Sequence, residues 1–205
     1  YRDSLCLPFY TDCIIIVMFG NEMTNREKLL RRVGLKCADF ARQFSYHRAL
    51  HDFKEARKLN FWICMYNNAI DLAVLDWFHL FGYHNDDLHW KKVANDINDF
   101  RRKLLSLLGL TKNEWEEYRE TIKTYRDKDV AHIEVRPVSH VPEMLVALKA
   151  ADFYYKNVLS ELQSYSNYDK WPDDLFAYYK DSLEQSKKIA EVACNASMNI
   201  VEKVY

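Results

Sequence analysis

Glycine and proline are scarce in this chain, and their scarcity limits the folds that it can adopt. The 205 residues include four of each. A β-sandwich or β-barrel needs many tight turns, and a phosphate-binding loop needs several glycines. Hydrophobic residues make up 49% of the chain and charged residues 29%, an ordinary balance for a globular protein. The composition therefore favours one helical domain with a sizeable, aromatic-rich core.

The spacing of apolar residues and the helix caps predict an all-α fold, an antiparallel bundle of about six helices. Two capping boxes, Thr24 with Glu27 and Thr111 with Glu114, mark the beginnings of two helices. Gly82 is suited to end another. The helical segments are expected at about 25–56, 59–81, 90–108, 112–125, 142–162 and 172–200.

Two of these segments carry patterns that predict how they pack. Segment 59–81 is apolar nearly all round, which is typical of a buried helix. Segment 142–162 repeats apolar residues at heptad-like spacing, which suits packing on a partner helix and offers a surface for dimerisation. The residues of this seam are Met144, Leu148, Ala151, Tyr155, Val158 and Leu162.

Charge is unevenly distributed along the chain although the net charge is only −1. Residues 26–58 contain ten Lys or Arg against four Asp or Glu, and residues 91–103 contain five against two. The part from residue 142 onward has a net charge of −3. The basic segments are either a solvated helix face or a track for an RNA backbone.

The cysteines and the apolar runs indicate a cytoplasmic protein. Five cysteines without a CxxC pair argue against a disulfide framework and against a zinc site. The apolar run at 13–19 is far shorter than the roughly twenty residues of a membrane span. It also lacks the basic flank of a signal peptide. We therefore expect a reducing compartment and no membrane partner.

Residues 1–22 are expected to be an N-terminal extension. The chain does not begin with Met, whereas Met23 and the capping box after it resemble a natural start. Residues 1–22 are then either foreign to the protein or an over-extended start, and residues 23–205 form a single domain.

Arg126 and His132 are the candidate catalytic residues. Arginine is a permanent cation whose planar fork grips phosphate, and histidine transfers protons near neutral pH. Because RNA supplies its own nucleophile in the 2′-hydroxyl, such a pair is sufficient for its cleavage. Positions six apart on one straight helix point about 120° away from each other. Either the helix bends between them, or a twofold axis brings the Arg of one subunit to the His of another.

The alternative for this pair is structural. Arg126 can pair with Asp127 or Asp129, and His132 can cap a helix. Asp129 and His132 match half of a carboxylate–histidine metal motif, but the other half is missing.

Other histidines offer weaker candidates. His47 and His51 lie four apart on a basic helix, but no third metal ligand is evident. His79 and His89 are expected to pack and hydrogen-bond near Trp77 and Trp90. We therefore expect no metal and no cofactor.

Three stretches resemble a known superfamily. Residues 125–134, Tyr-Arg-Asp-Lys-Asp-Val-Ala-His-Ile-Glu, are similar to the Arg-polar-x-x-x-x-His signature of the HEPN superfamily. Residues 73–82, with Asp-Trp-Phe-His-Leu-Phe-Gly at their end, and the His-Trp-Lys-Lys of residues 89–92 resemble the AbiU-like abortive-infection branch. The resemblance spans roughly residues 55–160.

The resemblance implies a homodimeric helical bundle that cleaves RNA without a metal and leaves a 2′,3′-cyclic phosphate. Arg126 would bind the scissile phosphate, and His132 would act as general base or acid. Asp127 stands where the superfamily often has Asn, and its charge repels phosphate; Lys128 could offset that charge. A toxin or phage-defence role is implied. The alternative is a non-catalytic module of this fold that binds RNA, a nucleotide or a partner antitoxin.

Overall fold

The structure, a computed structural model, describes residues 23–54, 58–130, 141–165 and 171–202. Within these ranges the chain is an all-α bundle without β-strands, which confirms the predicted fold class. The expected extension at residues 1–22 lies outside the described residues. The helices are α2 Asn25–His51, α3 Asn60–Phe81, α4 Trp90–Val93, α5 Ile97–Leu108, α6 Lys112–Tyr125, the π-helix η2 Arg126–Val130, α7 Met144–Leu162 and α8 Leu175–Ser197.

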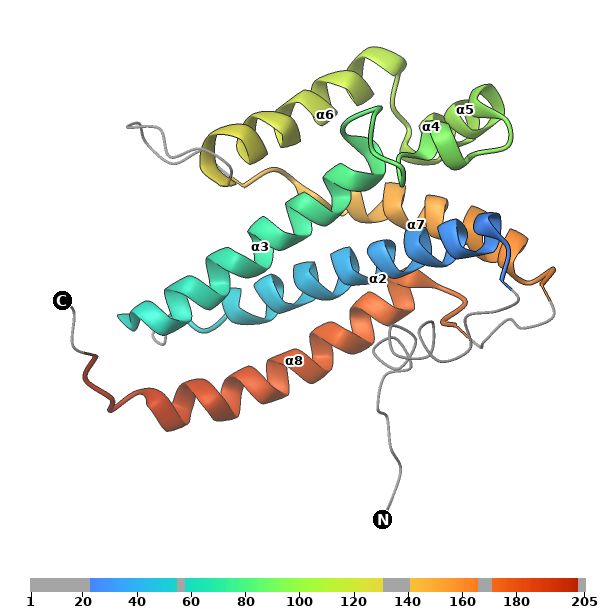
Figure 1. Ribbon diagram of the computed structural model, residues 1–205. Coiled ribbons are helices and arrows are strands. Elements are labelled where there is room, and N and C mark those ends of the chain that lie inside the picture. Colours follow the sequence, from blue (N-terminus) through green and yellow to red (C-terminus); the bar gives the residue numbers. More distant parts are fainter. Residues whose placement is uncertain (1–22, 55–57, 131–140, 166–170, 203–205) are drawn as a thin grey trace.

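Helix α2 is the centre of the bundle. It lies between α3 and α8, and α7 also packs against it (Figure 1). The neighbouring helices approach closely because α2 presents small side chains, among them Gly34, Cys37, Ala41 and Ser45, all of them buried. These residues leave room for larger groups from outside, such as the Trp171 ring, which lies against Gly34.

Some cations of α2 are held in ion pairs inside the fold, whereas Lys28, Arg32 and Arg48 are exposed. Arg31 is buried with Glu27, and Lys36 Nζ lies 2.8 Å from Asp76 Oδ1 on α3. Arg42 is buried and pairs with Asp39. Arg31 and Arg42 therefore do not belong to a solvated face or an RNA track, whereas for the exposed cations of residues 26–58 that expectation stays a prediction. A count of charges along the segment does not reveal these ion pairs, whose acidic partners are Glu27 and Asp39 on α2 and Asp76 on α3.

Helix α3 is less buried than its sequence predicted. Its C-terminal half packs into the core, but its N-terminal half exposes Phe61 (55%), Met65 (39%) and Leu72 (46%). The prediction of a fully buried helix is therefore wrong for this half. Hydropathy shows that a face is apolar, but it does not show whether another element covers that face.

The heptad-like seam of α7 is buried within this chain. All six of its residues, from Met144 to Leu162, belong to the hydrophobic core that α7 forms with its neighbours. The expectation that this seam offers a dimerisation surface is wrong, because the partner helices of the seam come from the same chain.

The helix ends follow the predicted caps with two differences. The Thr111–Glu114 capping box is present in full, whereas Thr24 accepts the Glu27 N–H but Glu27 turns its carboxylate to Arg31. The single helix predicted at 90–108 is divided into α4 and α5, because Asp96 caps a new helix by accepting the amides of residues 98 and 99. No helix in the described ranges is long and apolar enough to span a membrane.

An aromatic cluster fixes α6 on the end of α3. The Trp77 ring stacks on Phe81 at 5.1 Å between ring centroids, and its other contacts include Trp115 at 5.9 Å and Tyr118 at 6.0 Å on α6. Edge-to-face geometry adds about 0.5–1.5 kcal/mol for each such pair beyond area burial. The cluster therefore sets the position of the whole of α6 and of η2, which continues it.

Replacement of Gly34 by alanine is expected to destabilise the fold. The new methyl group would collide with the Trp171 ring. Such overpacking lowers the stability by about 1–3 kcal/mol, which outweighs the gain of about 1 kcal/mol from the higher helix propensity of alanine. Thermal unfolding followed by circular dichroism should show a melting temperature lower by several degrees. A smaller ring in the double variant with Trp171→Phe should recover part of the loss; a more stable Gly34→Ala protein would contradict the close approach.

Candidate functional site

The candidate site lies where α6 passes into the π-helix η2. The backbone N–H of Arg126 faces the carbonyls of both Ile122 and Lys123, at the point where the hydrogen-bonding register changes. Such π-helical turns are rare and are frequent at functional sites. The Tyr125 hydroxyl donates to Asp71 Oδ1 on α3 at 2.9 Å, which ties the beginning of η2 to the bundle.

The Arg126 side chain is enclosed by two aromatic rings. Its guanidinium carbon lies 4.2 Å from the ring centre of Phe78 and 4.7 Å from that of Tyr83. The two rings meet edge to face, with their centroids 4.9 Å apart. Cation–π contacts of this kind hold a guanidinium in a fixed position without using its N–H donors. We refer to Phe78 and Tyr83 as the aromatic cage.

Two nitrogens of the Arg126 guanidinium are left without an aligned hydrogen bond. Nε and Nη2 are buried and make no aligned hydrogen bond, and the side chain as a whole is only 16% exposed. Nη2 lies 2.8 Å from Asp127 Oδ1 as an ion pair, and Lys123 Nζ lies 3.6 Å from the other Asp127 oxygen. A buried donor without a hydrogen-bond partner lowers the stability of the fold by about 1–3 kcal/mol. The position of Arg126 is therefore not explained by a contribution to stability, which makes it a candidate for a ligand-binding role.

The loop that carries Tyr83 is fastened to α6 by Arg119. Its Nε donates to the Phe81 carbonyl at 2.7 Å and its Nη2 to the Gly82 carbonyl at 2.8 Å. These carbonyls at the end of α3 have no partner within the helix, so a cation is favourable there. Arg119 thus holds the end of α3, and with it the cage, against the helix that leads to Arg126.

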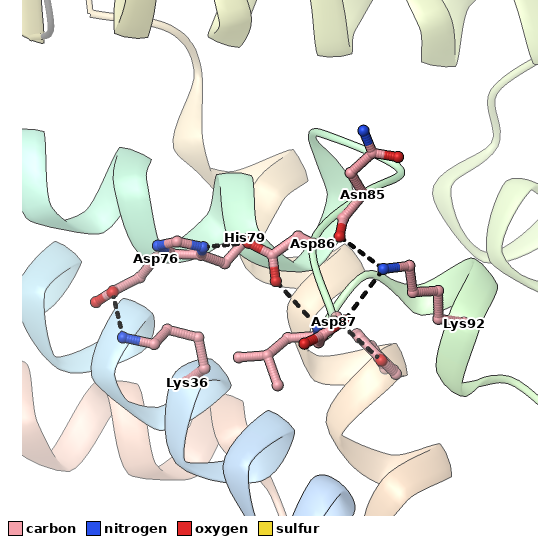
Figure 2. A network of polar contacts seen from close by, with 9 residues as sticks. Lys36, Asp76, His79, Asn85, Asp86, Asp87 and Lys92 are labelled. Carbon is pink, nitrogen blue, oxygen red and sulfur yellow. Dashed lines mark hydrogen bonds and ion pairs between the residues drawn. The ribbon is translucent and has the colours of Figure 1, made fainter.

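A polar network fixes the rest of this loop (Figure 2). His79 Nδ1 on α3 lies 2.5 Å from Asp86 Oδ2, and the Leu88 amide donates to Asp86 Oδ1 at 2.9 Å. Burial opposes ionisation of Asp86, but these two hydrogen bonds prevail and lower its pKa. Lys92 Nζ donates to the Asn85 carbonyl at 2.6 Å from the far side of the loop. The loop is therefore held at both ends, with Tyr83 near its beginning.

His89 is a structural residue at the end of this loop. It is fully buried, its Nδ1 accepts the Lys91 amide as the cap of α4, and its ring lies 5.8 Å from Trp90. Burial, followed by the charges of His84 and Arg119, lowers the pKa of His89 to about 3. The prediction that His89 packs near Trp90 is confirmed. The prediction that His79 forms a hydrogen bond is also confirmed, and its partner is Asp86.

The structure places three of the four predicted site residues. Arg126 and Asp127 are brought together as an ion pair, as the structural alternative predicted, and Lys128 is exposed. His132 lies outside the described residues, as does the predicted approach of His132 to Arg126. The helix changes from α to π at Arg126, and the structure does not decide between a bent helix and a twofold axis for the approach of His132.

The weak metal candidates find other partners. His47 Nδ1 lies 3.1 Å from the Tyr66 carbonyl, and His51 Nδ1 lies 3.2 Å from the Tyr66 hydroxyl. Within the described ranges no three His, Cys, Asp or Glu side chains gather as metal ligands would.

Sequence reasoning did not find the aromatic cage or Arg119. Phe78 is one apolar residue among many on α3, and no local pattern assigns its ring to an arginine on another helix. The only hint at Tyr83 is its position directly after Gly82, where the helix ends.

Comparisons with protein-family models, with curated proteins and with solved structures find no match for this chain.

The pKa of His89 predicts that the fold loses stability in acid. Because the folded value of about 3 lies below the ordinary 6.5, the unfolded chain binds the proton more readily as the pH falls below 6.5. The loss continues down to about pH 3, with a slope approaching about 1.4 kcal/mol per pH unit.

The control for this prediction is His89→Asn, which can still cap α4 but does not titrate. Urea unfolding at several pH values between 4 and 6.5 should give a shallower pH dependence for His89→Asn than for the parent protein. Equal slopes would show that His89 is not held neutral in the fold.

Proposed function

We propose that this chain is a metal-independent endoribonuclease of the HEPN type, acting in the cytoplasm as a toxin or phage-defence effector. The observation that carries the proposal is Arg126, a guanidinium held in place by the aromatic cage, whose buried Nε and Nη2 make no aligned hydrogen bond within the described residues. A phosphate oxygen is the acceptor that such a fork binds best. The all-α fold agrees with this assignment.

In the proposed reaction Arg126 binds the non-bridging oxygens of the scissile phosphate. His132 removes the proton of the ribose 2′-hydroxyl, and the 2′-oxygen attacks phosphorus. The bond from phosphorus to the 5′-oxygen breaks, and that oxygen takes up a proton. The products are a 2′,3′-cyclic phosphate and a 5′-hydroxyl. The guanidinium stabilises the extra charge of the pentacovalent phosphorus, where a fixed donor is most effective.

The proposal requires the aromatic cage to open. Tyr83 is 50% exposed, and its hydroxyl makes no hydrogen bond to the described residues, so it is the ring that can move aside. Phe78 is buried and stays as the support of the guanidinium. A homodimer belongs to the proposal, because a twofold axis can bring the Arg126 of one subunit to the His132 of the other in a shared cleft.

Ribonuclease activity is tested with the full chain, total RNA and a chelator. Cleavage should persist in the chelator and should fall by about 100-fold or more in His132→Ala and in Arg126→Ala, the range typical of a lost acid–base or electrostatic group. The matched controls are His51→Ala and Arg102→Ala, whose side chains lie on α2 and α5. Cleavage that needs a metal, or that survives both site variants, would end the proposal.

The contact of Asp127 with Arg126 favours a second candidate, a non-catalytic module that binds RNA, a nucleotide or an antitoxin. Its Oδ1 lies 2.8 Å from Nη2, where a phosphate oxygen would have to bind. A carboxylate in that position competes with the phosphate for the guanidinium and repels it.

The Asp127→Asn variant separates the two candidates. Its binding of single-stranded RNA should be about tenfold tighter, equivalent to about 1.4 kcal/mol, because the repulsive charge is removed. Fluorescence anisotropy measures the affinity, and the cleavage assay runs in parallel. Tighter binding without cleavage supports the binding module, and tighter binding with faster cleavage supports the nuclease. Unchanged affinity would show that phosphate does not approach Arg126; Asp99→Asn on α5 is the control.

A further inference from the structure

A groove of about 830 Å³, with neither Arg126 nor the aromatic cage in its lining, lies between α2, α3 and α8. Helices α3 and α8 lie on either side of α2, which forms the floor (Figure 1). The groove is hollow because α8 turns small residues toward it, among them Ser182, Ser186, Ala190 and Ala193. Its volume falls within the roughly 300–1,000 Å³ of small-molecule sites.

Contacts between distant parts of the chain fix the two walls of the groove. Trp62 Nε1 on α3 donates to Ser197 Oγ at the end of α8 at 2.8 Å. Glu202, beyond α8, accepts the amide of Phe61 at 3.0 Å and so caps the first turn of α3. Lys187 on α8 pairs with Asp52 after α2 at 2.7 Å. The groove is therefore a built feature of the fold with one end held closed.

The half of the groove near this closed end is apolar. Its lining includes Leu50, Trp62, Met65 and Ile189, and the last is 70% exposed. Contiguous apolar surface of this kind does not stabilise the monomer and marks binding sites in many proteins. This half is suited to a hydrocarbon chain.

The other half carries two tyrosines and one carboxylate. Tyr178 and Asp181 lie three residues apart on α8 and so share a face, and Tyr46 on α2 lines the same part of the groove. Asp181 is the only charged side chain among the described lining residues, and it pairs with no cation there. Arg42 lies against Tyr178 but is buried and paired with Asp39, so its charge is taken up inside the fold.

Carboxylate and aromatic rings together are the groups that bind an ammonium ion. Asp181 would repel an anionic head group, and the nearby charge of Arg42 is offset by its ion pair with Asp39. We propose that this groove binds a single-chain amphiphile with an ammonium head group. The head lies between Tyr46, Tyr178 and Asp181, and the tail extends about 18 Å along α8 toward Ala193, at 1.5 Å per residue. This site is independent of the proposed nuclease function.

The test uses the full chain and a neutral fluorescent probe, N-phenyl-1-naphthylamine, which brightens in apolar sites. Dodecyltrimethylammonium, below its micelle-forming concentration, should displace the probe at about one-tenth of the concentration that dodecanoate needs. That ratio corresponds to about 1.4 kcal/mol. Equal potency of the two would overturn the charge argument, and displacement by a basic amphipathic peptide but not by the alkylammonium would assign the groove to a helix instead.

Two variants with matched controls locate the site. Asp181→Asn should still bind the probe but lose the preference for the cation, whereas Glu184→Gln, on the same helix outside the groove, should retain it. Ala193→Trp should fill the groove and abolish probe binding, whereas Ala196→Trp, exposed outside it, should not. Circular dichroism confirms that each variant folds. Probe binding that survives Ala193→Trp, or a preference that survives Asp181→Asn, would overturn the proposal.

Discussion

The position of α2 at the centre of the bundle is the constraint on which the rest of the structure depends. Three long helices pack on it, and about half of its residues are buried. Gly34 and its small neighbours permit this close approach. The same position forces the polar groups of α2 to find internal partners, as Arg31 does with Glu27 and Ser45 with Ser182. Such buried pairs add little net stability, but loss of one partner is costly because it leaves a buried charge or donor unpaired.

The central position of α2 also explains which features of the fold could be predicted from sequence. Helix ends depend on groups within a few residues of each other, and the capping box at Thr111 was identified correctly. Burial depends on which element covers a face, and that information is not local. The basic segment around Arg42 therefore looked exposed and is buried, whereas the apolar segment around Met65 looked buried and is partly exposed. The seam of α7 was correctly identified as a packing surface, but its partners lie in the same chain.

In the candidate site, too, the features that depend on neighbouring residues could be predicted, and those that depend on tertiary packing could not. The pattern around Arg126 identified the residue, and its neighbour Asp127 was expected as a partner because the two are adjacent in sequence. The cage of Phe78 and Tyr83, and the clamp by Arg119, depend on how the ends of α3 and α6 meet. The spacing of residues along the chain does not predict how these two helix ends pack together. An isolated motif can thus name a candidate cation, but only the fold shows that its buried Nε and Nη2 make no aligned hydrogen bond and that the Asp127 carboxylate lies beside Nη2.

Helix α3 contributes to both of the proposed ligand sites. Its C-terminal end carries Phe78 and leads into the loop of Tyr83, and its N-terminal half forms one wall of the groove with Trp62 and Met65. The two surfaces are stabilised by different contacts, since Arg119 of α6 holds the first and the end of α8 holds the second. A ligand in the groove would replace solvent at exposed side chains such as Met65 and Leu72, which take no part in the contacts that hold Arg126. The partial exposure of α3 is therefore compatible with a stable cage.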